Sequence, residues 1–303
     1  MGNLEVDLGF ITLKNPIIPA SGTFGYGEEF SDFFDLNILG AFILKGIYKE
    51  KRDGNTPPRI YETPSGILNS IGLAGPGTDE LKKIIKRVTK KTDTPIIVNV
   101  CGESDEEYLE VAESFDIMDE VSLLELNISC PNIREGGACP AQNERHTYRL
   151  VKLIKDNVKK PVIVKLSPNV SDISSIALSA QEAGADAISL VNTFLGLAVD
   201  LENRKPVFDN VFAGLSGPAI KPLALRLVWE VSSSVSIPVI GIGGISSGKD
   251  VLEFILAGAS AVQTGTINMI EPGASIRIIN EIIELMKQLK IDSISDIRGR
   301  LEI

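Results

Sequence analysis

Residues 161–191 read PVIVKLSPNVSDISSIALSAQEAGADAISLV, and this stretch holds one complete strand–helix–strand unit. The short apolar run at 161–166 predicts a strand buried on both faces. The amphipathic segment 172–183 predicts a helix, and Gly184 after it suits the left-handed residue that ends many helices. The next apolar run, 186–191, predicts a second strand. Two strands joined by a crossover helix indicate parallel neighbours in one sheet.

The same pattern recurs along the chain. Leu256-Ala-Gly-Ala-Ser-Ala-Val echoes Glu182-Ala-Gly-Ala-Asp-Ala-Ile, and Pro95, Pro161 and Pro238 lie at the starts of three predicted strands. Strands are predicted at 17–20, 40–44, 95–100, 123–128, 161–166, 186–191, 237–242 and 260–264. Helices are predicted at 78–91, 104–114, 144–158, 172–183, 218–234, 248–257 and 273–289. Eight such units favour an α/β fold closed into a (β/α)₈ TIM barrel.

Further features refine this barrel. Segments 6–8 and 11–13 flank Gly9-Phe10 and predict an N-terminal hairpin that plugs the bottom of the barrel. Long loops follow strands two, four and six, at 46–77, 129–143 and 192–217, and long loops in compact domains are usually functional or disordered. Because no linker interrupts the pattern, we expect a single domain over 1–303. Expected helix N-caps are Thr78, Ser104 and Ser171.

Composition excludes several classes of function. The chain has 303 residues with 30 Lys and Arg against 40 Asp and Glu, a net charge of −10 that argues against nucleic-acid binding. His146 is its one histidine, which excludes multi-histidine metal sites, and we expect no metal. Three cysteines, Cys101, Cys130 and Cys139, make no disulfide framework and indicate a reducing, cytoplasmic location. We also expect neither a secretory signal nor a membrane span.

Polar residues gather where the predicted strands end, which is where barrel enzymes place their active sites. Any one of them is most simply explained as a helix cap or a partner for a loop carbonyl. Their recurrence at the same end of successive strands instead indicates a polar, planar, partly anionic ligand. Gly243-Gly244 and Gly265-Thr266 follow strands seven and eight, where such barrels frequently bind phosphate.

These residues make the sequence resemble the class 1 dihydroorotate dehydrogenases, most of all the catalytic subunit of the class 1B, NAD-linked enzymes. The resemblance covers about residues 4–290. It rests on Ala20-Ser21-Gly22-Thr23, Lys45-Gly46, Asn69-Ser70-Ile71-Gly72-Leu73, Asn127-Ile128-Ser129-Cys130-Pro131-Asn132, Val164-Lys165-Leu166-Ser167-Pro168-Asn169, Asn192-Thr193, Gly214-Leu215-Ser216-Gly217-Pro218 and Gly241-Ile242-Gly243-Gly244-Ile245.

The resemblance implies one FMN per chain and oxidation of dihydroorotate to orotate in pyrimidine (UMP) biosynthesis. The residues that would hold the flavin are Ser21, Gly22, Lys45, Gly46, Asn99, Asn127, Lys165, Val191, Gly217, Gly243, Gly244, Gly265 and Thr266. Those that would hold the substrate are Lys45, Asn69, Ser70, Ile71, Gly72, Leu73, Asn127, Asn132, Asn192 and Thr193. Cys130 would be the catalytic base and Lys165 a second catalytic residue.

Chemistry agrees with these roles. The flavin would accept a hydride, and a thiolate at Cys130, with a reference pKa of about 8.5, would take the proton. Lys165 would stabilise negative charge on the reduced flavin. The sequence has neither the cysteine spacing of an iron–sulfur cluster nor a dinucleotide-binding glycine motif. If NAD⁺ is the acceptor, FAD and a 2Fe-2S cluster must sit on a partner subunit, in a heterotetramer built on a homodimer.

Alternatives remain open on the sequence alone. The scaffold also suits a reductase of uracil or thymine, or an inert flavin-carrying subunit, and fumarate is the class 1A alternative to NAD⁺. Two segments depart from the family pattern, Ala74-Gly75 after the Asn69 motif and Ala138-Cys139-Pro140 in the loop after strand four.

Overall fold

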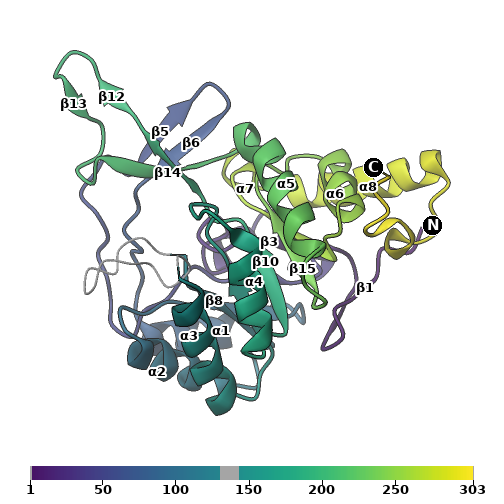
Figure 1. The fold of residues 1–303 in the computed structure, drawn as a ribbon, viewed down its shortest axis with the longest axis horizontal. Coiled ribbons are helices and arrows are strands. Elements are labelled where there is room, and N and C mark those ends of the chain that lie inside the picture. The colour runs from purple at the N-terminus through teal and green to yellow at the C-terminus, as the bar shows by residue number, and fades with distance from the viewer. Residues whose placement is uncertain (1, 130–142, 303) are drawn as a thin grey trace.

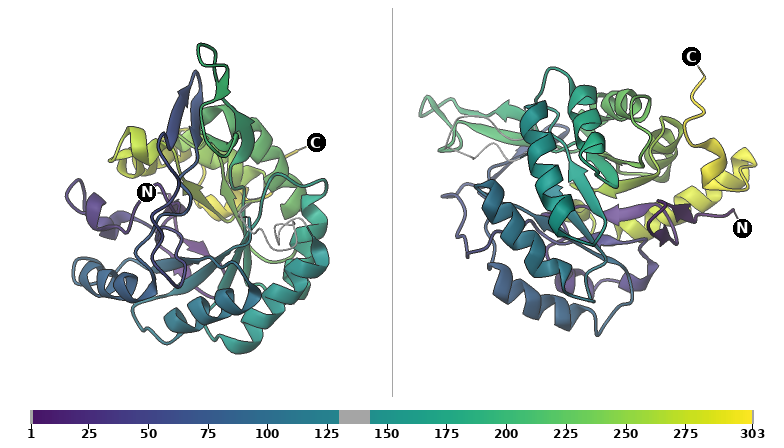
Figure 2. Two further views of the ribbon diagram at one scale, coloured as in Figure 1. Left: turned by 90° about the vertical axis from the view of Figure 1, so that its left-hand side faces the viewer. Right: turned by 60° about the horizontal axis from the view of Figure 1, so that its bottom comes forward.

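The computed structural model describes residues 2–129 and 143–302, and its main body is a barrel of parallel strands surrounded by helices (Figures 1 and 2). The eight strands follow the order β3-β16-β15-β10-β9-β8-β7-β4. The amide of Gly40 donates to the carbonyl of Ile17 over 3.1 Å, which joins the two ends of this order. The strands are β3 (Ile17–Pro19), β4 (Phe42–Ile43), β7 (Ile96–Val100), β8 (Leu123–Asn127), β9 (Val162–Lys165), β10 (Ala187–Leu190), β15 (Val239–Ile242) and β16 (Ala261–Thr264).

Helices follow most of these strands and lie on the outside of the barrel (Figure 2). They are α1 (Thr78–Val88), α2 (Asp105–Asp116), α3 (Glu144–Asn157), α4 (Ile173–Glu182), α5 (Lys221–Ser232), α6 (Gly248–Leu256), α7 (Ile267–Ile270) and α8 (Ala274–Leu289). The α/β TIM-barrel prediction is therefore confirmed, strand by strand.

Burial explains why these segments fold as they do. In α1 the buried residues Leu81, Ile84, Ile85 and Val88 fall at helical spacing and face the sheet. In β9 and β10 every residue is buried, as parallel strands covered on both faces require. Fully burying one such aliphatic side chain contributes about 1.5–3 kcal/mol, so the core favours this arrangement strongly.

The helix ends confirm some sequence predictions and correct others. Ser104 caps α2, with its Oγ accepting from the Glu107 amide, and Gly184 and Gly258 adopt φ of +97° and +114° after their helices. Thr78 and Ser171 are not N-caps. Gly77 precedes α1 at φ +84°, a conformation that favours glycine, and Asp172 caps α4 because its carboxylate reaches the Ser175 amide.

Two of the long loops form a second sheet that the sequence did not predict. β5 (Ile60–Thr63) and β6 (Gly66–Asn69) come from the loop after β4, and β11 (Phe194–Leu197) and β14 (Phe212–Ser216) come from the loop after β10. They pair in the antiparallel order β11-β14-β6-β5. A small hairpin of β12 (Val199–Asp200) and β13 (Lys205–Pro206) extends from the same end of the barrel (Figure 1). This sheet covers part of the carboxyl end of the barrel.

The predicted N-terminal hairpin is present as β1 (Val6–Asp7) and β2 (Thr12–Leu13), with Gly9 at φ +84°. Val6, Leu8 and Leu13 are buried in the main core. The hairpin leads into the amino end of β3, away from β5, β6 and β14 (Figure 1).

Candidate active site

A cavity of about 360 Å³ lies at the carboxyl ends of the barrel strands, beneath the second sheet. Residues from nearly every strand end line it, and β5 and β6 contribute Ile60, Ile67 and Asn69 from above. The structure brings together all the residues predicted to hold the flavin: Ser21, Gly22, Lys45, Gly46, Asn99, Asn127, Lys165, Val191, Gly217, Gly243, Gly244, Gly265 and Thr266.

Most residues predicted to hold the substrate line the same cavity, namely Lys45, Asn69, Ile71, Leu73, Asn127, Asn192 and Thr193. Ser70 and Gly72 do not. The Ser70 hydroxyl accepts from the Asn55 amide nitrogen over 2.9 Å, and Gly72 adopts φ +72°. Both therefore shape the segment that carries Ile71 and Leu73. Cys130, Asn132 and Cys139 lie outside the described residues.

Cys101, expected to be a small buried side chain, is fully buried. Its Sγ lies 3.6 Å from Asn99 Oδ1, just below the cavity.

Two lysines make the cavity cationic. Lys165 is 5% exposed, and its Nζ donates to Ser21 Oγ over 3.3 Å. Lys45 is partly buried, and burial together with the nearby Arg59 guanidinium lowers its pKa from the ordinary value, while Glu29 opposes the shift. A site with these charges favours an anionic ligand.

A series of hydrogen bonds runs along one wall. Asn127 Nδ2 donates to Asn99 Oδ1 over 3.1 Å, and Ser129 Oγ donates to Asn127 Oδ1 over 2.8 Å. Asn192 Nδ2 in turn donates to Ser129 Oγ. We call Asn99, Asn127, Ser129 and Asn192 the polar chain. It offers a ligand fixed amide groups, which suit a ring with alternating carbonyl and N–H groups.

The glycine loops after β15 and β16 form a cradle. A side chain at Gly244, which has φ +71°, would lie 2.7 Å from the Lys221 backbone nitrogen. A Cβ at Gly265 would instead meet nothing within 4 Å, although Gly265 lines the cavity. Open space beside backbone amides is what a phosphate group requires, so these loops fit the phosphate of a flavin mononucleotide.

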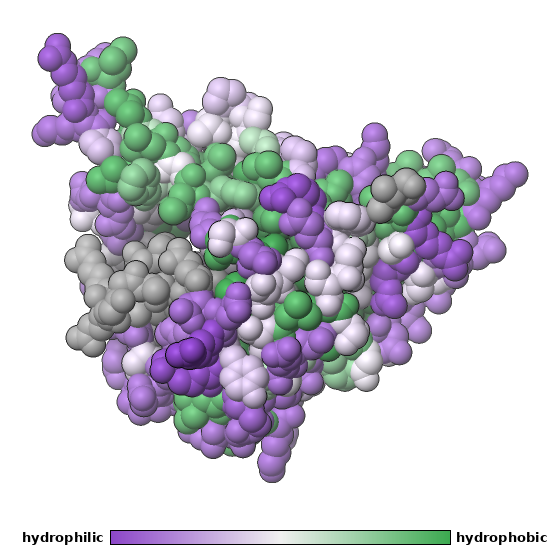
Figure 3. All heavy atoms as spheres, viewed as in Figure 1, coloured by the Kyte–Doolittle hydropathy of each residue, from purple (hydrophilic) through white to green (hydrophobic). Residues whose placement is uncertain are grey.

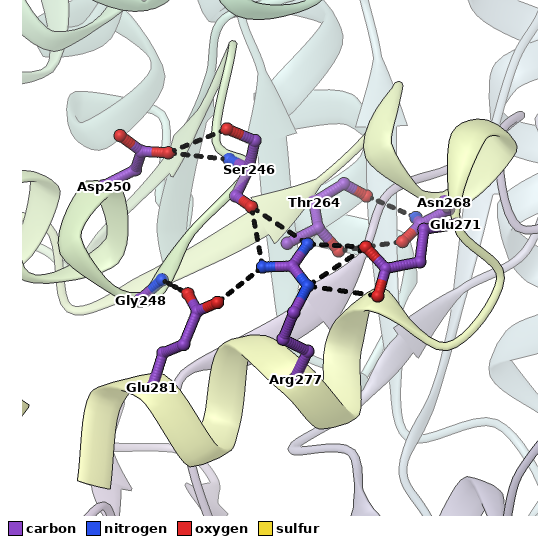
Figure 4. A network of polar contacts seen from close by, with 8 residues as sticks. All are labelled: Ser246, Gly248, Asp250, Thr264, Asn268, Glu271, Arg277 and Glu281. Carbon is purple, nitrogen blue, oxygen red and sulfur yellow. Dashed lines mark hydrogen bonds and ion pairs between the residues drawn. The ribbon is translucent and has the colours of Figure 1, made fainter. Parts of the chain in front are cut away.

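Arg277 on α8 ties the two glycine loops together (Figure 4). Its guanidinium donates to the Ser246 carbonyl after β15, over 3.3 Å, and to Glu271 after α7, over 2.7 Å. It also bonds Glu281, whose other oxygen accepts from the Gly248 amide at the start of α6 over 2.6 Å. Asp250 adds to this arrangement by accepting from Ser246.

Sequence reasoning missed three residues. Glu125 stands alone as a charge inside the apolar run 123–126, and that isolation was the available signal. Arg59 and Arg277 gave no such signal, because only the tertiary structure brings them close to Lys45 and to the glycine loops.

Within residues 2–129 and 143–302, no three His, Cys, Asp or Glu side chains gather as metal ligands would. In the same part of the chain, no helix combines the length and apolar character needed to cross a bilayer.

Comparisons with known proteins agree with this geometry. A family model described as dihydroorotate dehydrogenase matches residues 3–286. A "Dihydroorotate dehydrogenase B (NAD(+)), catalytic subunit" from Bacteroides thetaiotaomicron is 47% identical over 303 residues, covering 100% of both chains. A protein of the same name from Geobacter sulfurreducens is 48% identical over 301 residues, covering 99% of both.

Among solved structures, DHODH from Eimeria tenella, in complex with ferulenol, superposes with a TM-score of 0.83. The alignment covers 98% of this chain and 88% of that one, at 21% identity. This likeness concerns the barrel fold.

Proposed function

Because this chain belongs to the dihydroorotate dehydrogenase family, we propose that it oxidises dihydroorotate to orotate with FMN, in pyrimidine biosynthesis. The observation that carries this proposal is one cavity whose lining joins the glycine cradle, two lysines and a wall of amides. The flavin phosphate would lie at Gly243, Gly244, Gly265 and Thr266, which line the same cavity as both lysines.

FMN, when bound, supplies the hydride acceptor. The chain's own residues orient both ligands. Lys165 would face the pyrimidine end of the flavin, where a fixed cation stabilises negative charge. Lys45 would pair with the substrate carboxylate, and Asn69, Asn127 and Asn192 would bond the substrate ring.

The proton would go to Cys130. This assignment rests on the sequence motif alone, since Cys130 and Asn132 lie outside the described residues. Ser129, the residue before Cys130, is buried and bonded to Asn127 and Asn192 in the cavity wall, which gives the motif a fixed starting point.

We propose NAD⁺ as the final acceptor, reached through a partner subunit that carries FAD and a 2Fe-2S cluster. The relatives named "Dihydroorotate dehydrogenase B (NAD(+)), catalytic subunit" support this choice over fumarate. The proposed location is the cytoplasm.

We propose a homodimer as part of the assembly, and an exposed apolar surface supports the presence of a contact site. Apolar side chains gather over the second sheet (Figure 3). Leu195, Leu197 and Phe212 are each more than half exposed, and Leu201 is 85% exposed. Contiguous exposed apolar surface of this kind marks contact sites.

The test is anaerobic mixing of the flavin-loaded protein with dihydroorotate. Rapid bleaching of the flavin absorbance supports the proposal. Bleaching only by dihydrouracil or dihydrothymine would indicate another pyrimidine as substrate, and no bleaching by any of the three would indicate a flavin carrier. Co-purification of an FAD and iron–sulfur subunit, with NADH formation by the complex, tests the acceptor.

A further inference from the structure

A carboxylate lies inside the barrel, directly below the cavity. Glu125 of β8 is fully buried and accepts from three donors. Asn99 Nδ2 donates to its Oε1 over 2.6 Å. Ser189 Oγ and Gln263 Nε2 donate to its Oε2 over 2.8 and 2.6 Å.

The position of Glu125 is unusual for a barrel interior. Glu125, Ser189 and Gln263 come from β8, β10 and β16, which are alternate strands, so they form one interior layer. Such layers are dominated by branched aliphatic side chains. Burying a carboxylate there is costly, because it needs donors from every side.

The layer also leaves a polar atom without a partner. Among the described residues, Gln263 Oε1 is buried and has no hydrogen-bond partner. Gln263 therefore turns its nitrogen toward Glu125 although its oxygen stays unpaired, which shows how strongly the carboxylate sets the direction of amides around it.

The same rule applies to Asn99. Glu125 accepts in each of its three hydrogen bonds, so the Asn99 nitrogen faces Glu125 and the Asn99 oxygen faces the other way. That oxygen accepts from Asn127 Nδ2. The Asn127 oxygen then accepts from the Ser129 hydroxyl, and the Ser129 oxygen accepts from the Asn192 nitrogen.

We propose that Glu125 is a positioning residue: by accepting from Asn99 it fixes the donor and acceptor direction of the whole polar chain, and so the pattern that the cavity presents to the pyrimidine ring. This inference rests on the proposed function for its ligand. If an amide of the polar chain were flipped, its carbonyl would face a carbonyl of the ring, or its N–H would face an N–H of the ring. A fixed amide direction therefore gives selectivity for the pyrimidine ring.

The test compares two apolar substitutions on the same carboxylate network. Glu125→Leu removes the acceptor of Asn99. Gln263→Leu removes a donor from the other oxygen and leaves the bond between Glu125 and Asn99 in place. Three quantities are measured on each variant: the melting temperature, the FMN content, and the dissociation constant for orotate from the change in flavin absorbance.

We expect Glu125→Leu to raise the orotate dissociation constant by about 10-fold or more, the scale of one misaligned hydrogen-bonding group. Gln263→Leu should stay within about 3-fold of wild type, whatever its melting temperature. Equal orotate affinities in the two variants would mean that Glu125 only supports the fold, and would overturn the inference.

If Glu125→Leu yields no folded protein, Ser129→Ala tests the polar chain at its third member, after Asn99 and Asn127. It removes the hydroxyl between Asn127 and Asn192 while Glu125 keeps its donors. A similar loss of orotate affinity is expected, and unchanged affinity contradicts the inference. Wild-type protein that fails to bind orotate would instead count against the proposed function itself.

Discussion

Glu125 and Gln263 meet across the inside of the barrel, with Gln263 Nε2 2.6 Å from Glu125 Oε2. Their strands, β8 and β16, stand four places apart in a ring of eight and are therefore opposite one another. This contact forms part of a polar layer under the cavity. That layer sets the donor and acceptor orientation of the polar chain above it.

The cradle at Gly265 makes a first prediction. Gly265→Ala should leave the melting temperature nearly unchanged, because its Cβ meets no atom within 4 Å. The methyl group would occupy space required by the phosphate, so FMN affinity should fall by about 10-fold or more. Gly273→Ala is the matched control, since its Cβ also meets nothing but lies outside the cavity lining. Fluorescence titration of the apoprotein with FMN measures both, and equal affinities would contradict a phosphate at Gly265.

The contacts of Arg277 lead to a second prediction, which concerns only the binding of the FMN phosphate. Arg277→Met would release the loops that carry Ser246 and Glu271, and we expect FMN affinity to fall several-fold while riboflavin affinity stays the same. A bidentate, multiply bonded arginine is stronger than an ordinary surface pair. Arg226→Met removes a simple ion pair with Glu230 and should change neither affinity. Parallel losses for FMN and riboflavin would show that Arg277 acts on the cavity in general.

The environment of Lys45 leads to a third prediction, which concerns the pH dependence of orotate binding. Burial and Arg59 lower the Lys45 pKa, so the free protein loses this charge at a lower pH than an ordinary lysine. Orotate affinity should be full below that pKa and should decline as the pH rises through it, beginning below 10.5. Arg59→Gln removes a nearby positive charge and should move the decline to higher pH.

Lys45→Met supplies the control for this titration. It should weaken orotate binding by about 10- to 100-fold, the scale of a charged hydrogen bond, and remove the decline. Titrations of flavin absorbance with orotate between pH 6 and 11 measure these effects. An unchanged pH profile in Lys45→Met would assign the decline to another group.

Cys130 makes a fourth prediction. Cys130→Ala should retain FMN but slow its reduction by dihydroorotate by about 10²–10⁴-fold, the usual loss for a general base. Cys139 belongs to the same predicted loop, and in the Cys139→Ala variant the flavin should be reduced at a near-normal rate. Anaerobic stopped-flow absorbance measures both, and normal reduction in Cys130→Ala would remove Cys130 from the mechanism.

Local sequence patterns were enough to predict the barrel. Apolar runs such as 161–166 are short, β-branched and continuous, and glycines such as Gly184 mark the helix ends, so each unit carries its own signal. The carboxyl ends of parallel strands converge, and this is why residues as distant as Ser21 and Thr266 could be placed in one cavity from the sequence.

What the sequence by itself determined is the set of barrel strands, their closure and the residues at their ends, because these depend on periodicity and on a fold rule. Only the tertiary structure decided the rest. The pairing of β6 with β14 joins loops about 145 residues apart, as in the bond from Asn69 to Gly214. The partners of Glu125 come from three other strands, and hydrogen bonding between residues so far apart leaves no periodic trace in the sequence.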